Sequence, residues 1–210
     1  MFDGPTPARP LALSLDIRRA GPGGAVLGPM RLEVAAGETV ALTGPSGVGK
    51  TTLLRLAAGL DRAFDGTRRA AAQLAVVFQE PALLPWRSAL DNLTLATGIT
   101  PGRAEDWLAR VGLPGLGARF PNQLSLGQQR RLSLARAFAA EPDLLLMDEP
   151  FVSLDQATAE AILALFEDLR ADREAGQPLA TLLVTHSGTE ARRLATRILA
   201  LTGSPARLTG

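Results

Sequence analysis

Lys50 is the only lysine among the 22 lysine and arginine residues of this 210-residue chain, and it stands in a glycine-rich stretch. Gly44, Gly49, Lys50 and Thr51 match the pattern G-x-x-x-x-G-K-[ST]. Such a loop turns its backbone N–H groups inward toward a phosphate, and lysine adds a compact charge that the broad planar group of arginine does not replace. We predict a phosphate-binding loop made of Gly44, Pro45, Ser46, Gly47, Val48, Gly49, Lys50, Thr51 and Thr52.

The same pattern predicts separate roles for two of its side chains. Lys50 is expected to reach the β- and γ-phosphates of a nucleotide, and the Thr51 hydroxyl to bind Mg²⁺. The alternative is a chance match, which average residue usage gives on the order of 1% of the time in a chain of this length. A predicted strand before the loop and a helix after it favour nucleotide binding.

Two acidic residues follow an apolar run. L-L-L-M-D-E-P places Asp148 and Glu149 at the end of a predicted strand. Asp148 is suited to hold Mg²⁺ through water, and Glu149 to polarise or position an attacking water. Acidic residues also end strands without any catalytic role, so this pair alone leaves the two interpretations evenly balanced.

Two further features are ambiguous without context. Leu124 opens L-S-L-G-Q-Q-R-R, which places Ser125 and Gly127 at the start of a predicted helix, where anions bind. Physics alone favours a simple capped amphipathic helix. His186, the only histidine, ends the run T-L-L-V-T-H, and a lone histidine in such a place is more often structural than catalytic.

Three short apolar runs are expected to position these residues as buried parallel strands, because each lacks polar alternation. In such sheets functional groups gather at the carboxyl ends of the strands. A helix should begin in the phosphate loop and end near Gly59. The runs are Thr39–Thr43, Leu144–Met147 and Thr181–Thr185.

The rest of the chain completes one α/β domain over residues 1–210. Residues 11–38 contain alternating apolar and polar residues and a turn-forming sequence, G-P-G-G at 21–24, so we expect antiparallel strands there. Another strand is expected at Leu74–Phe78, and a helix-to-strand step at Leu194–Leu201. We predict a P-loop core of mostly parallel sheet, an N-terminal antiparallel β subdomain, and an inserted α-helical subdomain at about residues 80–140.

Composition narrows the partners. A net charge of +1 gives no argument for nucleic acid or acidic lipid. The absence of cysteine suits a reducing compartment. The first ten residues do not resemble a signal peptide, and no apolar stretch approaches the roughly 18 residues that span a bilayer. Work at a membrane would therefore need another chain to supply the membrane part.

The order of the motifs resembles the nucleotide-binding subunits of ATP-binding cassette (ABC) transporters over nearly the whole chain. The matching motifs are the phosphate loop, Gln79 after V-V-F, the signature L-S-x-G-Q at Leu124–Gln128, D-E-P at Asp148–Pro150, S-L-D at Ser153–Asp155, and His186 after a strand.

This resemblance implies an ATPase that uses ATP and Mg²⁺. The implied catalytic residues are Glu149, His186 and Gln79, and the implied Mg²⁺ ligands are Thr51, Gln79 and Asp148. ATP would lie between the phosphate loop of one copy and Ser125, Gly127 and Gln128 of a second copy, with Asp155 at the interface.

The family also implies the setting. Its cassettes work as head-to-tail dimers, here expected to be homodimers, on an integral membrane permease and indirectly with a substrate-binding protein. The resemblance implies a peripheral protein at the cytoplasmic face of the inner or plasma membrane, with no nucleic acid partner. The stretch F-Q-E-P-A-L-L-P-W from Phe78 to Trp86 is similar to the loop of nitrate, sulfonate and taurine importers. Alternatively, it is only a surface loop that packs its tryptophan.

Two positions depart from the signature pattern. Leu126 stands where glycine is usual, which would cost strain if the backbone there needed a positive φ. Arg130 stands where glutamine is usual.

The adenine site departs as well. No aromatic residue lies between Phe2 and Phe64, whereas the family stacks adenine on an aromatic upstream of the phosphate loop. We expect Arg18 or Arg19 to stack on the base, since a guanidinium plane can do so, or base contact to be weak.

Two other functions compete with transport. A soluble ABC ATPase acting on nucleic acid or ribosomes usually has two cassettes or a long coiled coil, and this sequence shows neither. A regulatory cassette that binds nucleotide without turnover is favoured by Leu126 and the missing aromatic. The presence of Lys50, Glu149, Gln79 and His186 argues against it.

Overall fold

The computed structural model describes residues 10–20, 26–174 and 177–209, and within these ranges the strands form two sheets. The smaller sheet is antiparallel, in the order β2–β1–β4, and consists of β1 (Leu11–Ala20), β2 (Met30–Ala35) and β4 (Phe64–Ala70). The larger sheet has the order β5–β6–β7–β3–β8–β9, and its strands are β3 (Thr39–Thr43), β5 (Leu74–Val77), β6 (Leu144–Asp148), β7 (Ala180–Val184), β8 (Arg197–Gly203) and β9 (Ala206–Thr209).

Helices connect the strands of the larger sheet. In the described ranges they are α1 (Lys50–Ala58), α2 (Ala89–Thr97), α3 (Pro101–Arg110), the short 3₁₀ helix η2 (Pro121–Gln123), α4 (Leu126–Ala139), α5 (Gln156–Glu174) and α6 (Gly188–Leu194). None of these helices is long and apolar enough to cross a membrane.

The larger sheet is parallel except at one edge. Strand β3 pairs in parallel with β7 and β8, β6 pairs in parallel with β5 and β7, and β9 alone runs antiparallel to β8. The predicted fold class, a mostly parallel P-loop core with an N-terminal antiparallel sheet, is therefore confirmed. Because parallel strands end at the same edge, β3, β6 and β7 bring residues 44, 149 and 185 to one side of the sheet.

The core has one hydrophobic cluster on each face of this sheet. Leu144 and Leu146 of β6 join the cluster that contains α1 and the antiparallel sheet. Leu145 and Met147 point the other way, into the cluster formed with α4 and α5. Successive side chains of a strand alternate between faces, so a strand buried on both faces must be apolar throughout, as this run is.

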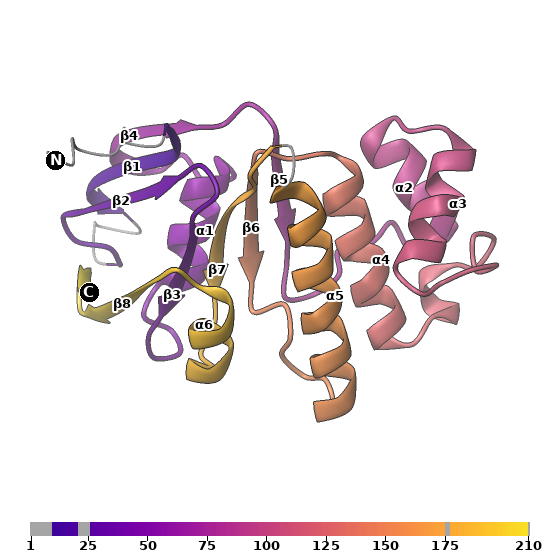
Figure 1. Cartoon of the computed structure of the whole chain (residues 1–210). Helices are drawn as coiled ribbons and strands as arrows, with labels where there is room; N and C mark the ends of the chain where they lie inside the picture. The colour runs from indigo at the N-terminus through magenta and orange to yellow at the C-terminus, as the bar shows by residue number, and fades with distance from the viewer. Residues whose placement is uncertain (1–9, 21–25, 175–176, 210) are drawn as a thin grey trace, which may run out of the picture.

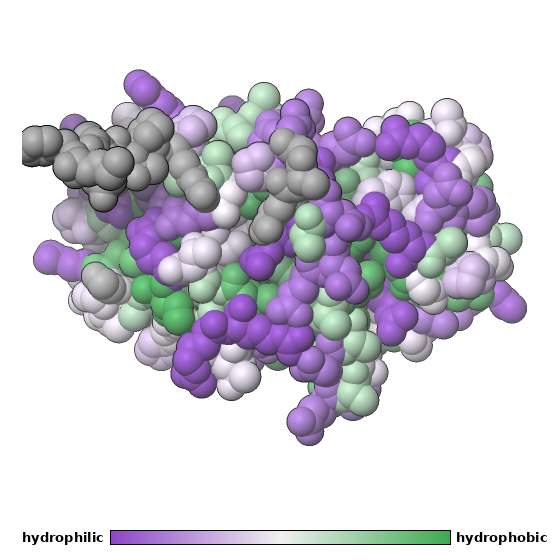
Figure 2. Space-filling view, in the orientation of Figure 1, coloured by the Kyte–Doolittle hydropathy of each residue, from purple (hydrophilic) through white to green (hydrophobic). Residues whose placement is uncertain are grey.

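The antiparallel sheet and helices α2 and α3 lie at opposite ends of the molecule (Figure 1). Helices α4 and α5 stand between the larger sheet and the α2–α3 pair. In the same orientation, most of the visible surface is hydrophilic, with smaller hydrophobic areas between (Figure 2).

The expected strand boundaries shift by one residue at several ends. The run expected at Thr181–Thr185 is the strand Ala180–Val184, and β6 extends to Asp148. Strands β4 and β9 were not expected, because F-D-G-T-R-R-A and A-R-L-T are short and mostly polar. The G-P-G-G turn expected at 21–24 lies outside the described residues.

Candidate functional site

The phosphate loop connects the end of β3 to the start of α1. Gly44 begins it with φ 144°, and a Cβ there would lie 2.4 Å from the carbonyl oxygen of Leu201 in β8. Only glycine fits this close approach. The loop therefore leaves the sheet directly against a strand from the far end of the chain.

Lys50 is folded into the loop that it follows. Its side chain is buried, and Nζ donates hydrogen bonds to the carbonyl oxygens of Gly44, at 2.8 Å, and Pro45, at 2.9 Å. An ammonium group has three N–H donors, so a third remains for a further acceptor. Pro45, Ser46 and Gly47 form the exposed tip of the loop.

The start of α1 is unlike the starts of four other helices. Its N-cap is Gly49, which has no side chain to accept from the first N–H groups. Side-chain hydroxyls cap α2, α3, α4 and α6, and they belong to Ser88, Thr100, Ser125 and Ser187. The uncapped N–H groups and positive dipole end of α1 are therefore suited to an anion.

Asp148 lies beside this loop at the end of β6. Its side chain is buried, and its Oδ1 has no hydrogen-bond partner among the described residues. Burial raises the pKa of the Asp148 carboxyl, and the nearby Thr51 hydroxyl and the charge of Lys50 oppose this shift. A divalent cation at this point would supply the missing partner, so Thr51 and Asp148 fit Mg²⁺.

Glu149 and His186 face each other at the same edge. Glu149 Oε2 lies 3.4 Å from His186 Nδ1. The Glu149 backbone has φ 44°, and its N–H donates to the Val184 carbonyl at 2.9 Å, which attaches it to β7. The carboxylate is 20% exposed and the imidazole 57% exposed, so both are open to water. The pair can position a water molecule and accept its proton.

Gln79 is exposed just after β5, at the carboxyl edge of the same sheet. The signature residues lie elsewhere. Ser125 caps α4, its Oγ accepting from the Gln128 N–H at 3.2 Å, while its own N–H donates to Gln128 Oε1 at 2.9 Å. Within one copy the structure brings the signature together with the S-L-D segment rather than with the phosphate loop. An open depression of about 470 Å³ is lined by Ser125, Leu126, Gly127, Gln128, Asp155 and Thr158, among others.

The strain considered for Leu126 does not arise. This residue starts α4 and is absent from the described non-glycine residues with positive φ, so leucine suits the backbone. Its side chain is 41% exposed at the edge of the depression.

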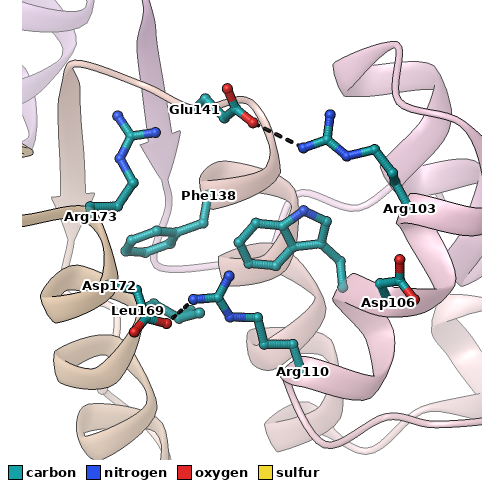
Figure 3. Close-up of a pocket in the computed structure, with 9 residues that line it drawn as sticks. Arg103, Asp106, Arg110, Phe138, Glu141, Leu169, Asp172 and Arg173 are labelled. Atoms are coloured by element: carbon teal, nitrogen blue, oxygen red, sulfur yellow. Dashed lines mark hydrogen bonds and ion pairs between the residues drawn. The ribbon is translucent and has the colours of Figure 1, made fainter. Parts of the chain in front are cut away.

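A second cavity, of about 260 Å³, lies away from the motifs between α3, the end of α4 and α5 (Figure 3). Two ion pairs cross it: Arg103 to Glu141 at 3.0 Å, and Arg110 to Asp172. Arg110 also stacks over Trp107, with its Cζ 4.8 Å from the ring centroid. These arginines are paired within the chain, so they attach α3 to the core.

Sequence reasoning missed the contact of Leu201 with Gly44. No sequence signal identifies a backbone carbonyl as the neighbour of a loop far away in the chain.

Known proteins are similar to this chain in sequence. A model of the family described as ABC transporter matches residues 27–152. The aliphatic sulfonates import ATP-binding protein SsuB 1 of Rhodococcus jostii (strain RHA1) is 44% identical over 183 residues, which are 84% of this chain and 73% of that protein. SsuB 2 of Frankia alni is 46% identical over 187 residues, which are 88% of this chain and 74% of that protein.

Solved structures are similar in fold. A dimeric structure of the ATP-binding cassette MJ0796 in a post-hydrolysis state, bound to ADP and Pi, superposes with a TM-score of 0.80 at 28% identity. The match covers 94% of this chain and 97% of that one. Another dimeric structure of the same cassette gives a TM-score of 0.76 at 29% identity, over 90% and 93% of the two chains.

Proposed function

This chain belongs to the ABC transporter family, and we propose that it is the ATP-hydrolysing subunit of an importer for aliphatic sulfonates. The membership inferred from the ordered motifs is confirmed by the family match and by the two relatives. The observation that carries the ATPase assignment is the sheet edge where Lys50 and Thr51 lie beside Asp148, next to the Glu149–His186 pair. The sulfonate assignment rests on what the relatives transport.

In the proposed mechanism, the chain's own groups bind and orient the ATP phosphates. The loop N–H groups of residues 44–52 and the free N–H of Lys50 hold the β- and γ-phosphates. Thr51, Asp148 and Gln79 hold Mg²⁺, which neutralises phosphate charge when bound. Glu149 positions the attacking water and takes its proton, and His186 contacts the γ-phosphate. Positioning and charge stabilisation supply most of the rate in such sites.

The proposed active unit is a head-to-tail homodimer. Ser125, Gly127 and Gln128 of the second copy close over the nucleotide held by the first. This arrangement explains why the signature and the phosphate loop form separate surfaces in one chain. Closure on ATP drives an integral membrane permease, with a substrate-binding protein acting on its other side. The chain would therefore act as a peripheral protein at the cytoplasmic face of the membrane.

Base contact is proposed to come from arginine. Arg18 and Arg19 are exposed near the end of β1. Arg18 forms a long ion pair with Asp65, at 3.8 Å, in which both side chains are exposed. Such a weak surface pair leaves a guanidinium able to stack on a base. If base contact is weak instead, GTP should be hydrolysed nearly as fast as ATP.

The test combines purification and transport. A tagged chain should co-purify with an integral membrane protein, and the complex should hydrolyse ATP faster when a binding protein loaded with alkanesulfonate is added. Stimulation by nitrate-loaded but not sulfonate-loaded protein would overturn the substrate assignment. A complex as inactive as its Glu149→Gln variant would instead favour a regulatory cassette, and the absence of a membrane partner would favour a soluble ATPase.

A further inference from the structure

Arg130 makes contacts that neither the motifs nor the relatives' names assign. It lies in the second turn of α4 and is 3% exposed. Its Nη1 donates to the carbonyl oxygen of Phe78 at 3.1 Å, and its Nη2 donates to that of Val152 at 3.3 Å. One guanidinium therefore holds two backbone segments that are distant in the sequence.

Each of these carbonyls comes directly before a segment with a proposed role. Phe78 precedes Gln79, and Val152 precedes the S-L-D segment that ends at Asp155. Arg130 itself belongs to the helix that Ser125 caps. The side chain thus connects three parts of the ATPase: the Gln79 loop, the S-L-D loop and the signature helix.

Arginine is a costly choice for this position. A buried charge loses its hydration, and both of its acceptors are neutral carbonyls. Its Nε has no hydrogen-bond partner among the described residues. Burial lowers the pKa of Arg130, and the charge of Glu80 partly opposes this. A fork with two separated nitrogens can bind two divergent acceptors, whereas the shorter glutamine side chain usual at this position has one donor nitrogen.

We propose that Arg130 is a positioning residue that makes the Gln79 loop and the S-L-D loop move as one unit. This inference rests on the proposed function, because it concerns how Gln79, proposed to hold Mg²⁺, and Asp155, proposed to lie at the dimer interface, are kept in a fixed relation. Without the guanidinium, each loop keeps its own fold but loses its direct connection to the other.

Arg136 of α4 supplies a matched control. It also donates to two carbonyl oxygens, those of Ala82 at 3.0 Å and Pro81 at 3.2 Å. Burial lowers its pKa in the same direction. Both of its acceptors belong to a single loop, however, so Arg136 anchors a loop without joining two.

Hydrogen exchange of the full chain tests the connection without requiring ATP. In Arg130→Met, amides of residues 78–82 and of residues 150–156 should both exchange about tenfold faster than in the wild type, because a shared restraint is lost. In Arg136→Met only residues 78–82 should be affected. Unchanged exchange at 150–156 in Arg130→Met would overturn the proposal.

Steady-state kinetics tests the functional consequence. Arg130→Met should lower kcat about tenfold and change the KM for ATP by less than about twofold, since the loops act on the reacting geometry rather than on nucleotide binding. Arg130→Lys, with a single donor nitrogen, should fall between. Equal kcat losses in Arg130→Met and Arg136→Met would contradict a specific role in joining the loops. A wild type that neither binds nor hydrolyses ATP would refute the proposed function, while the exchange result would still decide the connection.

Discussion

The phosphate loop and the cavity beneath α3 both contain basic side chains, yet they differ in what those side chains already contact. At the loop, Lys50 retains a free N–H, α1 begins without a side-chain cap, and Asp148 Oδ1 is buried without a partner. At the cavity, Arg103 and Arg110 are each paired with a carboxylate of the same chain. Arg173 also lines the cavity, and its Nε is likewise buried without a partner among the described residues, so one such atom alone does not indicate a ligand site. At the loop three features occur together, and this combination indicates the ligand site better than a cavity does.

The largest effect should follow from changing Lys50. Lys50→Arg should lower kcat/KM for ATP by about 10²–10³-fold, because the larger planar group cannot replace a phosphate donor in a narrow loop. An ATPase assay with the purified complex measures this loss.

The same lysine allows a chemical test. An amine-reactive reagent should modify Lys50 and the N-terminus, and Mg-ATP should protect Lys50. Absence of protection would contradict the loop assignment.

Glu149→Gln should abolish turnover while leaving binding intact. We expect kcat to fall by about 10²-fold or more, since the amide cannot accept a proton from water, and the affinity for ATP to stay within about threefold. Size-exclusion chromatography with ATP should show an accumulated dimer. His186→Ala, which removes the neighbouring imidazole, should lower kcat less. A Glu149→Gln variant with normal kcat would exclude Glu149 as the base.

The raised pKa of Asp148 predicts that the stability of the fold depends on pH and on bound metal. Because its folded pKa is raised above the usual 3.8, the folded chain holds a proton that the unfolded chain has released between these two values. The free energy of unfolding must then fall as pH rises through this interval, and stay lower at neutral pH. Without metal, Asp148→Asn should raise the free energy of unfolding at pH 7, because the neutral amide avoids the cost of burying a charge.

Adding Mg²⁺ with nucleotide distinguishes the metal-free site from the metal-bound site. The wild type should gain thermal stability from the metal, because binding to the folded state alone raises the unfolding temperature. Asp148→Asn should gain much less. Calorimetry with and without Mg²⁺ measures both, and an equal gain in the two proteins would mean that Asp148 does not hold the metal.

The smallest effect is expected at the cavity in Figure 3. Arg110→Met removes an ion pair whose partners are 41% and 64% exposed, so it should lower the free energy of unfolding by only about 0.5–1 kcal/mol. ATPase activity should stay within about twofold of the wild type. Arg103→Met should behave alike. A large loss of activity in either variant would show that the cavity serves more than the attachment of α3.

The parts of the site that could be predicted are those encoded by neighbouring residues. The loop around Lys50 and the strand before Asp148 follow from local patterns of glycine, charge and apolar runs. Contacts between distant segments could not be predicted in this way, and the Leu201 carbonyl against Gly44 and the two acceptors of Arg130 are examples. A one-dimensional pattern shows that a residue is apolar or charged but does not identify its partner.

The two strands that the sequence did not predict, β4 and β9, also depend on contacts between segments. β4 is held by its register with β1, and β9 by its register with β8, although their own residues favour strands only weakly. Tertiary pairing decides such segments. The strain expected at Leu126 was wrong for a different reason. It required a positive φ, which the first turn of a helix does not need.

The position of β3 has a consequence for synthesis on the ribosome. This strand carries the phosphate loop, yet both of its neighbours, β7 (Ala180–Val184) and β8 (Arg197–Gly203), lie more than a hundred residues later in the sequence. The loop is therefore translated well before its flanking strands and the Leu201 carbonyl beside Gly44, and it cannot acquire them until these residues have emerged. Pairing of such distant segments is slow to form, so the nascent chain must keep an apolar strand soluble in the meantime.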